Sequence, residues 1–167
     1  MIFSKTESFI NTEGFEEVTY KGYKYYYSGI LYLRGKKAGR ESVLAVAEEY
    51  EATGVIPFIK IFGAFCLIIC KPDGETIFFT DNSNLRCFFM GKNYIGNNFL
   101  ELIKYEKSNE FNMEALCEFF VLGGVYFGKT LIEGIRLSSN ESYYIYSNDT
   151  IKEVTKNIGN IDAPSSI

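Results

Sequence analysis

One segment of the chain has the spacing of a phosphate-binding loop. Residues 123–130, GGVYFGKT, satisfy the pattern GxxxxGK[ST], in which backbone amides cradle phosphates, the Lys contacts them and the Thr holds Mg²⁺. Such a loop must follow a buried strand and open a helix. Here the segment follows the helical pattern EALCEFFVL and runs into the strand-like LIEGIRL, with bulky Val125, Tyr126 and Phe127 where small residues are needed. We therefore predict no nucleotide site.

The chain contains no histidine. Nucleophile activation by Ser-His-Asp or Cys-His sets and zinc ligation by His all require an imidazole, so these chemistries are excluded. The four cysteines lie on apolar segments without paired CxxC spacing, which favours buried thiols over disulfides or a metal site. They are Cys66, Cys70, Cys87 and Cys117. We expect no bound metal and no cofactor.

Charge and hydropathy exclude two classes of partner. The net charge of −4 repels phosphate backbones and anionic lipid, so nucleic acid is not expected to bind. No stretch approaches the ~20 apolar residues of a membrane span, and the first residues, MIFSKTESF, lack a basic segment followed by an apolar signal core. We expect a cytoplasmic protein that does not contact a membrane.

Aromatic and β-branched residues predict a core rich in sheet, since the chain has 13 Tyr and 15 Phe. The predicted strands are two within residues 15–33 that turn near Lys21-Gly22, then 59–70, 75–80, 85–90 and 130–137, and a hairpin of 142–146 with 151–154. Residues 71–74, KPDG, are a strong turn signal between the second and third of these segments. The order of the strands from 59 to 90 predicts an antiparallel meander.

Three segments have helical spacing of apolar residues: 41–52, 98–107 and 113–122. Asn112 is a plausible N-cap for the third, and Gly123-Gly124 ends it. Strands and helices come in blocks instead of alternating, which predicts an α+β architecture with antiparallel sheets and helices outside. We expect a single domain over residues 1–158 and a flexible tail over 159–167.

Three blocks of sequence, in order, resemble the N-terminal class II glutamine amidotransferase domain of asparagine synthase-like proteins. The central block, EEYEATG followed by FGAFCLIICKPDGETIFFTDNSNLRCFFM, is similar to the family's helix, Gly-x-Phe strand, hairpin and strand ending in Asp. Gly63, Phe65 and Asp81 match this pattern. The second block, residues 112–145, resembles the family's helix, Gly-rich connection and closing hairpin, with Gly128, Thr130 and Gly134 as framework positions. The third block, YSGILY from Tyr27, resembles the family's Asn-Gly-Glu-Ile-Tyr.

The resemblance implies an Ntn-type fold, an αββα sandwich of two antiparallel sheets flanked by helices, somewhat reduced in this chain. It also implies that the chemistry is absent. The family attacks glutamine with an N-terminal Cys whose own α-amine acts as the base, whereas residue 2 here is Ile. The segment before Tyr25 is too short for the family's Arg-bearing glutamine loop.

By the same resemblance, four residues form a vestigial glutamine pocket. The family's oxyanion-hole Asn falls on Ser28, its Gly is kept as Gly29, and the neighbouring Glu becomes Ile30. The Asp that holds the glutamine amine falls on Arg40, which reverses the charge. We therefore predict no catalytic residue in this chain.

The resemblance implies a non-catalytic domain that acts as scaffold for an ATP-dependent adenylating ligase, in trans or in a missing C-terminal half; a homodimer is the other partner considered. The chain lacks the Ser-Gly-Gly-x-Asp-Ser pyrophosphate loop that such a ligase carries. Two alternatives stay open. One is a small-molecule binding module whose vacated pocket is lined by Tyr25–Tyr27, and the other is residual amidohydrolase activity using Ser4 or Cys66.

Overall fold

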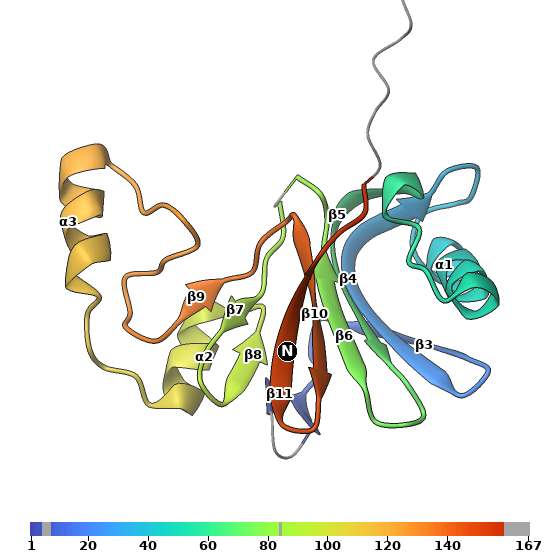
Figure 1. The fold of residues 1–167 in the computed structure, drawn as a ribbon, viewed down its shortest axis with the longest axis horizontal. Helices are drawn as coiled ribbons and strands as arrows, with labels where there is room; N and C mark the ends of the chain where they lie inside the picture. Colours follow the sequence, from blue (N-terminus) through green and yellow to red (C-terminus); the bar gives the residue numbers. More distant parts are fainter. Residues whose placement is uncertain (5–7, 84, 159–167) are drawn as a thin grey trace, which may run out of the picture.

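Two antiparallel sheets form the centre of the structure, a computed structural model that describes residues 1–4, 8–83 and 85–158 (Figure 1). The six-stranded sheet has the order β11-β10-β6-β5-β4-β3, with strands Glu16–Tyr20 (β3), Tyr23–Leu33 (β4), Ile61–Cys70 (β5), Thr76–Thr80 (β6), Ser142–Ser147 (β10) and Thr150–Thr155 (β11). The five-stranded sheet has the order β2-β1-β8-β7-β9, with strands Ile2–Ser4 (β1), Ser8–Asn11 (β2), Phe89–Met90 (β7), Tyr94–Gly96 (β8) and Arg136–Leu137 (β9). The helices are Arg40–Thr53 (α1), Phe99–Glu106 (α2) and Met113–Leu122 (α3), with a short 3₁₀ turn at Phe58–Lys60.

Three apolar clusters show how these elements are layered. An inter-sheet core joins Phe3 and Ile95 of the five-stranded sheet to Ile68 and Phe78 of the other. On the outer face of the six-stranded sheet, α1 packs over a second cluster, and α2 closes a third on the outer face of the five-stranded sheet. Each fully buried large side chain contributes about 1.5–3 kcal/mol. The layer order is therefore helix, sheet, sheet, helix, which confirms the predicted α+β class and αββα sandwich.

The side chains of β4 alternate between the two faces of its sheet, as the period of two in a strand requires. Tyr25 and Tyr27 belong to the cluster beneath α1, whereas Tyr26 belongs to the inter-sheet core. The turn before β4 is the predicted Lys21-Gly22 pair, both with positive φ, which suits a two-residue hairpin. The turn fixes the register of β3 with β4, and the same alternation runs along the longest strand pair, β4 with β5.

The three predicted helices are confirmed within two residues at each end. α1 ends at Gly54 in the left-handed conformation, and the Gly54 N–H donates to the Tyr50 carbonyl. The Asn98 side chain caps α2 by accepting from the Glu101 N–H, and Asn112 caps α3 by accepting from the Ala115 N–H. Gly123 ends α3 in the left-handed conformation, as its position in the sequence predicts.

The strand predicted at residues 85–90 is mostly wrong. The buried carboxylate of Asp81 accepts hydrogen bonds from the backbone amides of Ser83, Leu85 and Arg86, which fold this segment into a loop. Only Phe89–Met90 remains extended, and it pairs in the five-stranded sheet. The predicted meander from 59 to 90 is therefore wrong as well, because the chain leaves the first sheet after β6.

The strand predicted at residues 130–137 is also shorter than expected. Only Arg136–Leu137 pairs as β9, because the Thr130 hydroxyl donates to the Ile135 carbonyl at 2.7 Å and holds the segment between them as a turn. The short strands β1, β2 and β8 were not predicted. The predicted tail, 159–167, lies outside the residues that the structure describes. In the part that is described, no helix is long and apolar enough to cross a membrane.

Candidate functional site

Gly29 on β4 and Gly63 on β5 occupy positions of the ladder that leave no room for a Cβ. Both have positive φ, at 93° and 118°. A Cβ on Gly29 would collide with the carbonyl oxygen of Ala64, and a Cβ on Gly63 would collide with that of Ile30. Since neither strand backbone can yield without breaking the ladder, both positions require glycine. This gives a physical reason for one predicted pocket residue and one predicted framework residue.

Next to these glycines, three apolar side chains remain exposed, and we call them the apolar mouth: Ile30, Tyr32 and Phe62. By strand alternation they point to the same face as Tyr26, toward the five-stranded sheet. They are nonetheless 65%, 41% and 44% exposed, and none of them belongs to the inter-sheet core. The Tyr32 and Phe62 rings stack with their centroids 5.6 Å apart. The mouth is thus an open apolar end of the sandwich.

The groups around the mouth lack an activated nucleophile. Ser28 lies on the same face and pairs with Cys66 across the ladder. Burial raises the pKa of Cys66 to about 12, and its thiol donates to the Cys87 carbonyl at 3.8 Å. A thiol at such a pKa is not ionised at neutral pH and is a poor nucleophile. Ser4, the other residue considered for hydrolysis, is only 2% exposed within β1.

Arg40 does not join Ser28, Gly29 and Ile30. It is exposed at the start of α1, and its guanidinium donates to the Glu17 carbonyl of β3 at 3.2 Å. Its charge acts on Tyr27, which faces the α1 side of the sheet, whereas Ser28 and Ile30 face the opposite side. The structure therefore brings together three of the four predicted pocket residues.

The tyrosines of β4 do not line a common pocket, so this part of the small-molecule alternative is wrong. Tyr25, Tyr26 and Tyr27 are 0%, 8% and 4% exposed and point to alternate faces. Burial raises the pKa of Tyr26 and of Tyr27 to about 12. Their bulk fills two separate cores, which a sequence run of tyrosines cannot reveal.

The segment that resembles a phosphate-binding loop uses its polar groups internally. It follows α3 and leads into no helix, as expected from the sequence. The Lys129 ammonium pairs with Glu114 at 2.7 Å and Glu118 at 2.6 Å, which raises the pKa of Lys129. Thr130 is held by its bond to Ile135, and the Gly128 carbonyl accepts from the Leu137 N–H at 2.7 Å. The two groups that would hold phosphate and Mg²⁺ are already bonded to the protein.

The other predicted framework residues, Phe65, Asp81 and Gly134, also have structural roles. Phe65 is 2% exposed and packs edge-on to Phe79 in the cluster beneath α1. Asp81 organises the loop after β6, as described above. Gly134 has φ of 76° with nothing close to an added Cβ, so its turn conformation alone favours glycine.

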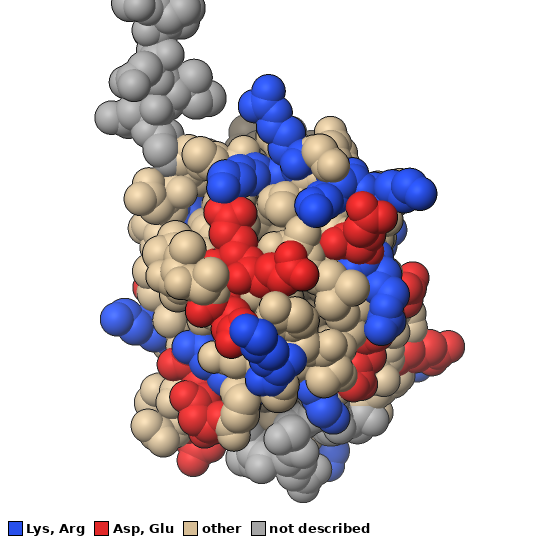
Figure 2. Space-filling view, turned by 90° about the vertical axis from the view of Figure 1, so that its right-hand side faces the viewer, with Lys and Arg blue, Asp and Glu red and all other residues tan. Residues whose placement is uncertain are grey.

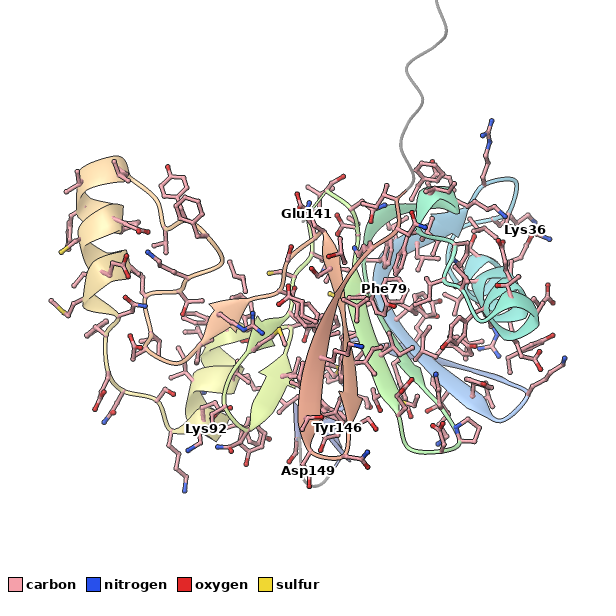
Figure 3. The ribbon with its side chains drawn as sticks, viewed as in Figure 1. Lys36, Phe79, Lys92, Glu141, Tyr146 and Asp149 are labelled. Carbon is pink, nitrogen blue, oxygen red and sulfur yellow. The ribbon has the colours of Figure 1, made fainter. Side chains whose placement is uncertain are left out.

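An open cleft of about 1090 Å³ lies between the segment after α3 and the end of β10, and sequence reasoning missed it. Lys92 and Glu141, both labelled in Figure 3, are among its lining residues. On its wall the Tyr144 hydroxyl donates to Glu153 at 3.1 Å, and Arg136 pairs with the same carboxylate at 3.4 Å. None of the four predicted pocket residues lines this cleft.

Charges on the face that carries α1 and β3 are mixed. Figure 2 shows Lys and Arg interspersed with Asp and Glu there. Lys21 pairs with Glu51 at 2.7 Å and Lys60 with Glu49 at 2.6 Å. Such exposed pairs contribute little to stability, and they leave no field of a single sign. Among the described residues, no group of three or more Cys, Asp or Glu side chains could hold a metal ion.

Comparison with known proteins adds little beyond this. No family model matches the sequence, and no curated protein matches it. One similar solved structure is described as the allosteric regulatory enzyme of purine biosynthesis, with a TM-score of 0.36 and 13% identity. The match covers 82% of this chain and 29% of that one, so the chain spans less than a third of that protein's length. Similarity at this level assigns no family, and the class rests on the observed architecture: an α+β sandwich with an apolar open end.

Proposed function

We propose that this chain is a non-catalytic, glutamine amidotransferase-like domain that acts as a scaffold for an ATP-dependent adenylating ligase, present in trans or as a further part of the same polypeptide. The observation that carries the proposal is the apolar mouth. Ile30 stands where the resembling family has a carboxylate, and Tyr32 and Phe62 extend the apolar surface beside it. Exposed apolar patches of this kind mark contacts with other proteins.

The same surface is unsuited to hydrolysis of glutamine. An acyl-transfer site needs donors aimed at a developing oxyanion and a nucleophile with an adjacent base. Ile30 offers neither, the nearby Cys66 thiol is buried with its pKa raised to about 12, and the chain has no histidine. The chemistry of the complex would therefore belong to the ligase.

A test of the proposal combines this chain with an ATP-dependent adenylating ligase from the same genome and measures pyrophosphate release with and without the chain. The scaffold role predicts that the chain raises the rate. Ile30→Asp should weaken the effect roughly tenfold or more, because a carboxylate buried without a partner costs at least ~1.4 kcal/mol. Val55→Asp, at a site that is 62% exposed elsewhere on the surface, is the matched control and should act as the wild type does. A rate that does not depend on the chain would contradict the proposal.

A second candidate function is favoured by the cleft. Its volume of about 1090 Å³ and the ordered Tyr144, Glu153 and Arg136 groups on its wall could hold a polar small molecule. A thermal-shift screen of polar metabolites tests this, with Arg136→Ala as the variant. A stabilising compound whose effect disappears in that variant would support the binding function, and no stabilising compound would count against it.

A further inference from the structure

Helix α3 stands clear of both sheets (Figure 1). It has ten residues, of which Ala115 alone is buried. An isolated helix shorter than ~12–15 residues is marginal in water even with favourable residues. Its caps and the pairing of Lys129 with Glu114 and Glu118 hold its ends, but no apolar layer of the described chain covers it.

The exposed side of α3 is an apolar stripe: Met113, Cys117, Phe120 and Val121, at i, i+4, i+7 and i+8. This is the spacing of one helix face. Met113, Phe120 and Val121 are 64%, 76% and 79% exposed. A helix of a folded domain normally turns such a stripe toward the core, so here the amphipathic pattern points outward.

The two charged side chains of α3 are already paired within the chain, so they do not favour a partner of opposite charge. Glu114 and Glu118 both pair with Lys129 of the same chain. The following stretch, residues 119–128, contains no charged residue. Two identical stripes can therefore face each other without repulsion between like charges, as the self-complementary contact of a two-fold dimer requires.

The exposed area is sufficient for a dimer. Six large apolar side chains on α3 and the segment after it are 45–93% exposed: Met113, Phe119, Phe120, Val121, Leu122 and Phe127. At roughly 200 Å² for one fully exposed large side chain, they offer about 800 Å². A standard stable interface buries about 800 Å² on each partner. The stripe together with the exposed side chains beside it, Phe119, Leu122 and Phe127, thus offers about the area that a second copy would have to cover.

We propose that two copies of this chain associate through α3, packed antiparallel about a two-fold axis. Cys117 lies at the centre of the stripe, between Met113 and Val121, so an antiparallel pair centred on the stripe brings Cys117 opposite the same residue of the second copy. This surface is separate from the apolar mouth. The association therefore goes beyond the scaffold role and does not depend on it.

Sedimentation velocity over a dilution series tests the association. The wild type should be a dimer that dissociates on dilution, and Phe120→Glu should be a monomer at every concentration. Leu100→Glu is the matched control, since Leu100 is 69% exposed on α2, and it should remain a dimer. Circular dichroism on each variant confirms that it is folded. A wild type that is monomeric throughout, or a Phe120→Glu variant that still dimerises, overturns the proposal.

Chemical cross-linking tests the antiparallel geometry with the chain's own thiol. A short bismaleimide should join two copies through Cys117, which is exposed, and Cys117→Ser should abolish the product. A dimer by sedimentation that gives no cross-link overturns the antiparallel arrangement. Phe120→Glu should still stimulate the ligase, so failure of the dimer and failure of the scaffold role give different results.

Discussion

The lack of room for a Cβ at Gly63 allows the most quantitative prediction. Gly63→Ala places a methyl group against the Ile30 carbonyl at φ of 118°. A non-glycine residue in such a conformation costs about 1–3 kcal/mol. Forcing the extra carbon into a packed ladder costs about 1–3 kcal/mol more. We expect a loss of about 2–6 kcal/mol in the free energy of unfolding, a large share of the ~5–15 kcal/mol of a typical domain.

Urea unfolding followed by circular dichroism measures this loss, with Gly74→Ala as the control. Gly74 has φ of 91° in the turn between β5 and β6, but nothing lies within 4 Å of an added Cβ. It should therefore lose only the conformational part, about 1–2 kcal/mol. If Gly63→Ala costs no more than Gly74→Ala, the expected clash with the Ile30 carbonyl is refuted, and with it this reason for glycine at position 63.

Three further predictions follow from buried groups. Burial lowers the pKa of Lys156 to about 8 from 10.5, so between these pH values the unfolded chain binds more protons than the folded chain. As pH rises through this range, the wild type should therefore gain stability relative to Lys156→Met, by on the order of 3 kcal/mol. A difference in urea midpoint that stays the same across the range would contradict this. In the Phe120→Glu variant, which we expect to be monomeric, Cys117 should react with a chromogenic disulfide reagent far faster than Cys66, whose pKa burial raises to about 12. Loss of the fast phase when Cys117→Ser is added confirms the assignment, and its persistence contradicts it. Asp81→Ala should lower the free energy of unfolding in urea by about 3 kcal/mol, because three backbone amides lose the buried carboxylate that accepts from them. The control Asp73→Ala removes one exposed hydrogen bond from the Glu75 N–H and should cost less than ~1 kcal/mol. Similar losses would show that the loop does not depend on Asp81.

The features that sequence predicted well are those with local causes. The Lys21-Gly22 turn and the Asn112 cap act within a few residues, so their signals lie in the sequence itself. After β6 the chain passes from the six-stranded to the five-stranded sheet, which the sequence did not predict. This passage depends on the Asp81 carboxylate accepting from amides up to five residues away and on the pairing of β7 with β8 and β9. Two- and three-residue strands carry too little pattern to identify.

The candidate site was predictable only in part, for a related reason. The resemblance drew attention to Ile30, but its exposure depends on how far the second sheet extends, which no local pattern encodes. The outward stripe of α3 was equally hidden, because Met113, Phe120 and Val121 give the same periodicity whether a helix faces a core or solvent. Arg40 was placed by alignment alone, and its bond to Glu17 lies on the other side of the sheet.

We expect this sandwich to carry no glutamine-hydrolysing chemistry of its own. The direct measurement is to incubate the purified chain with glutamine and determine ammonia against a heat-denatured control. We expect no ammonia above the control at any pH from 6 to 9, a range that lies well below the pKa of Cys66, which burial raises to about 12. Ammonia release that exceeds the control and disappears in Ser4→Ala or Cys66→Ser would contradict it.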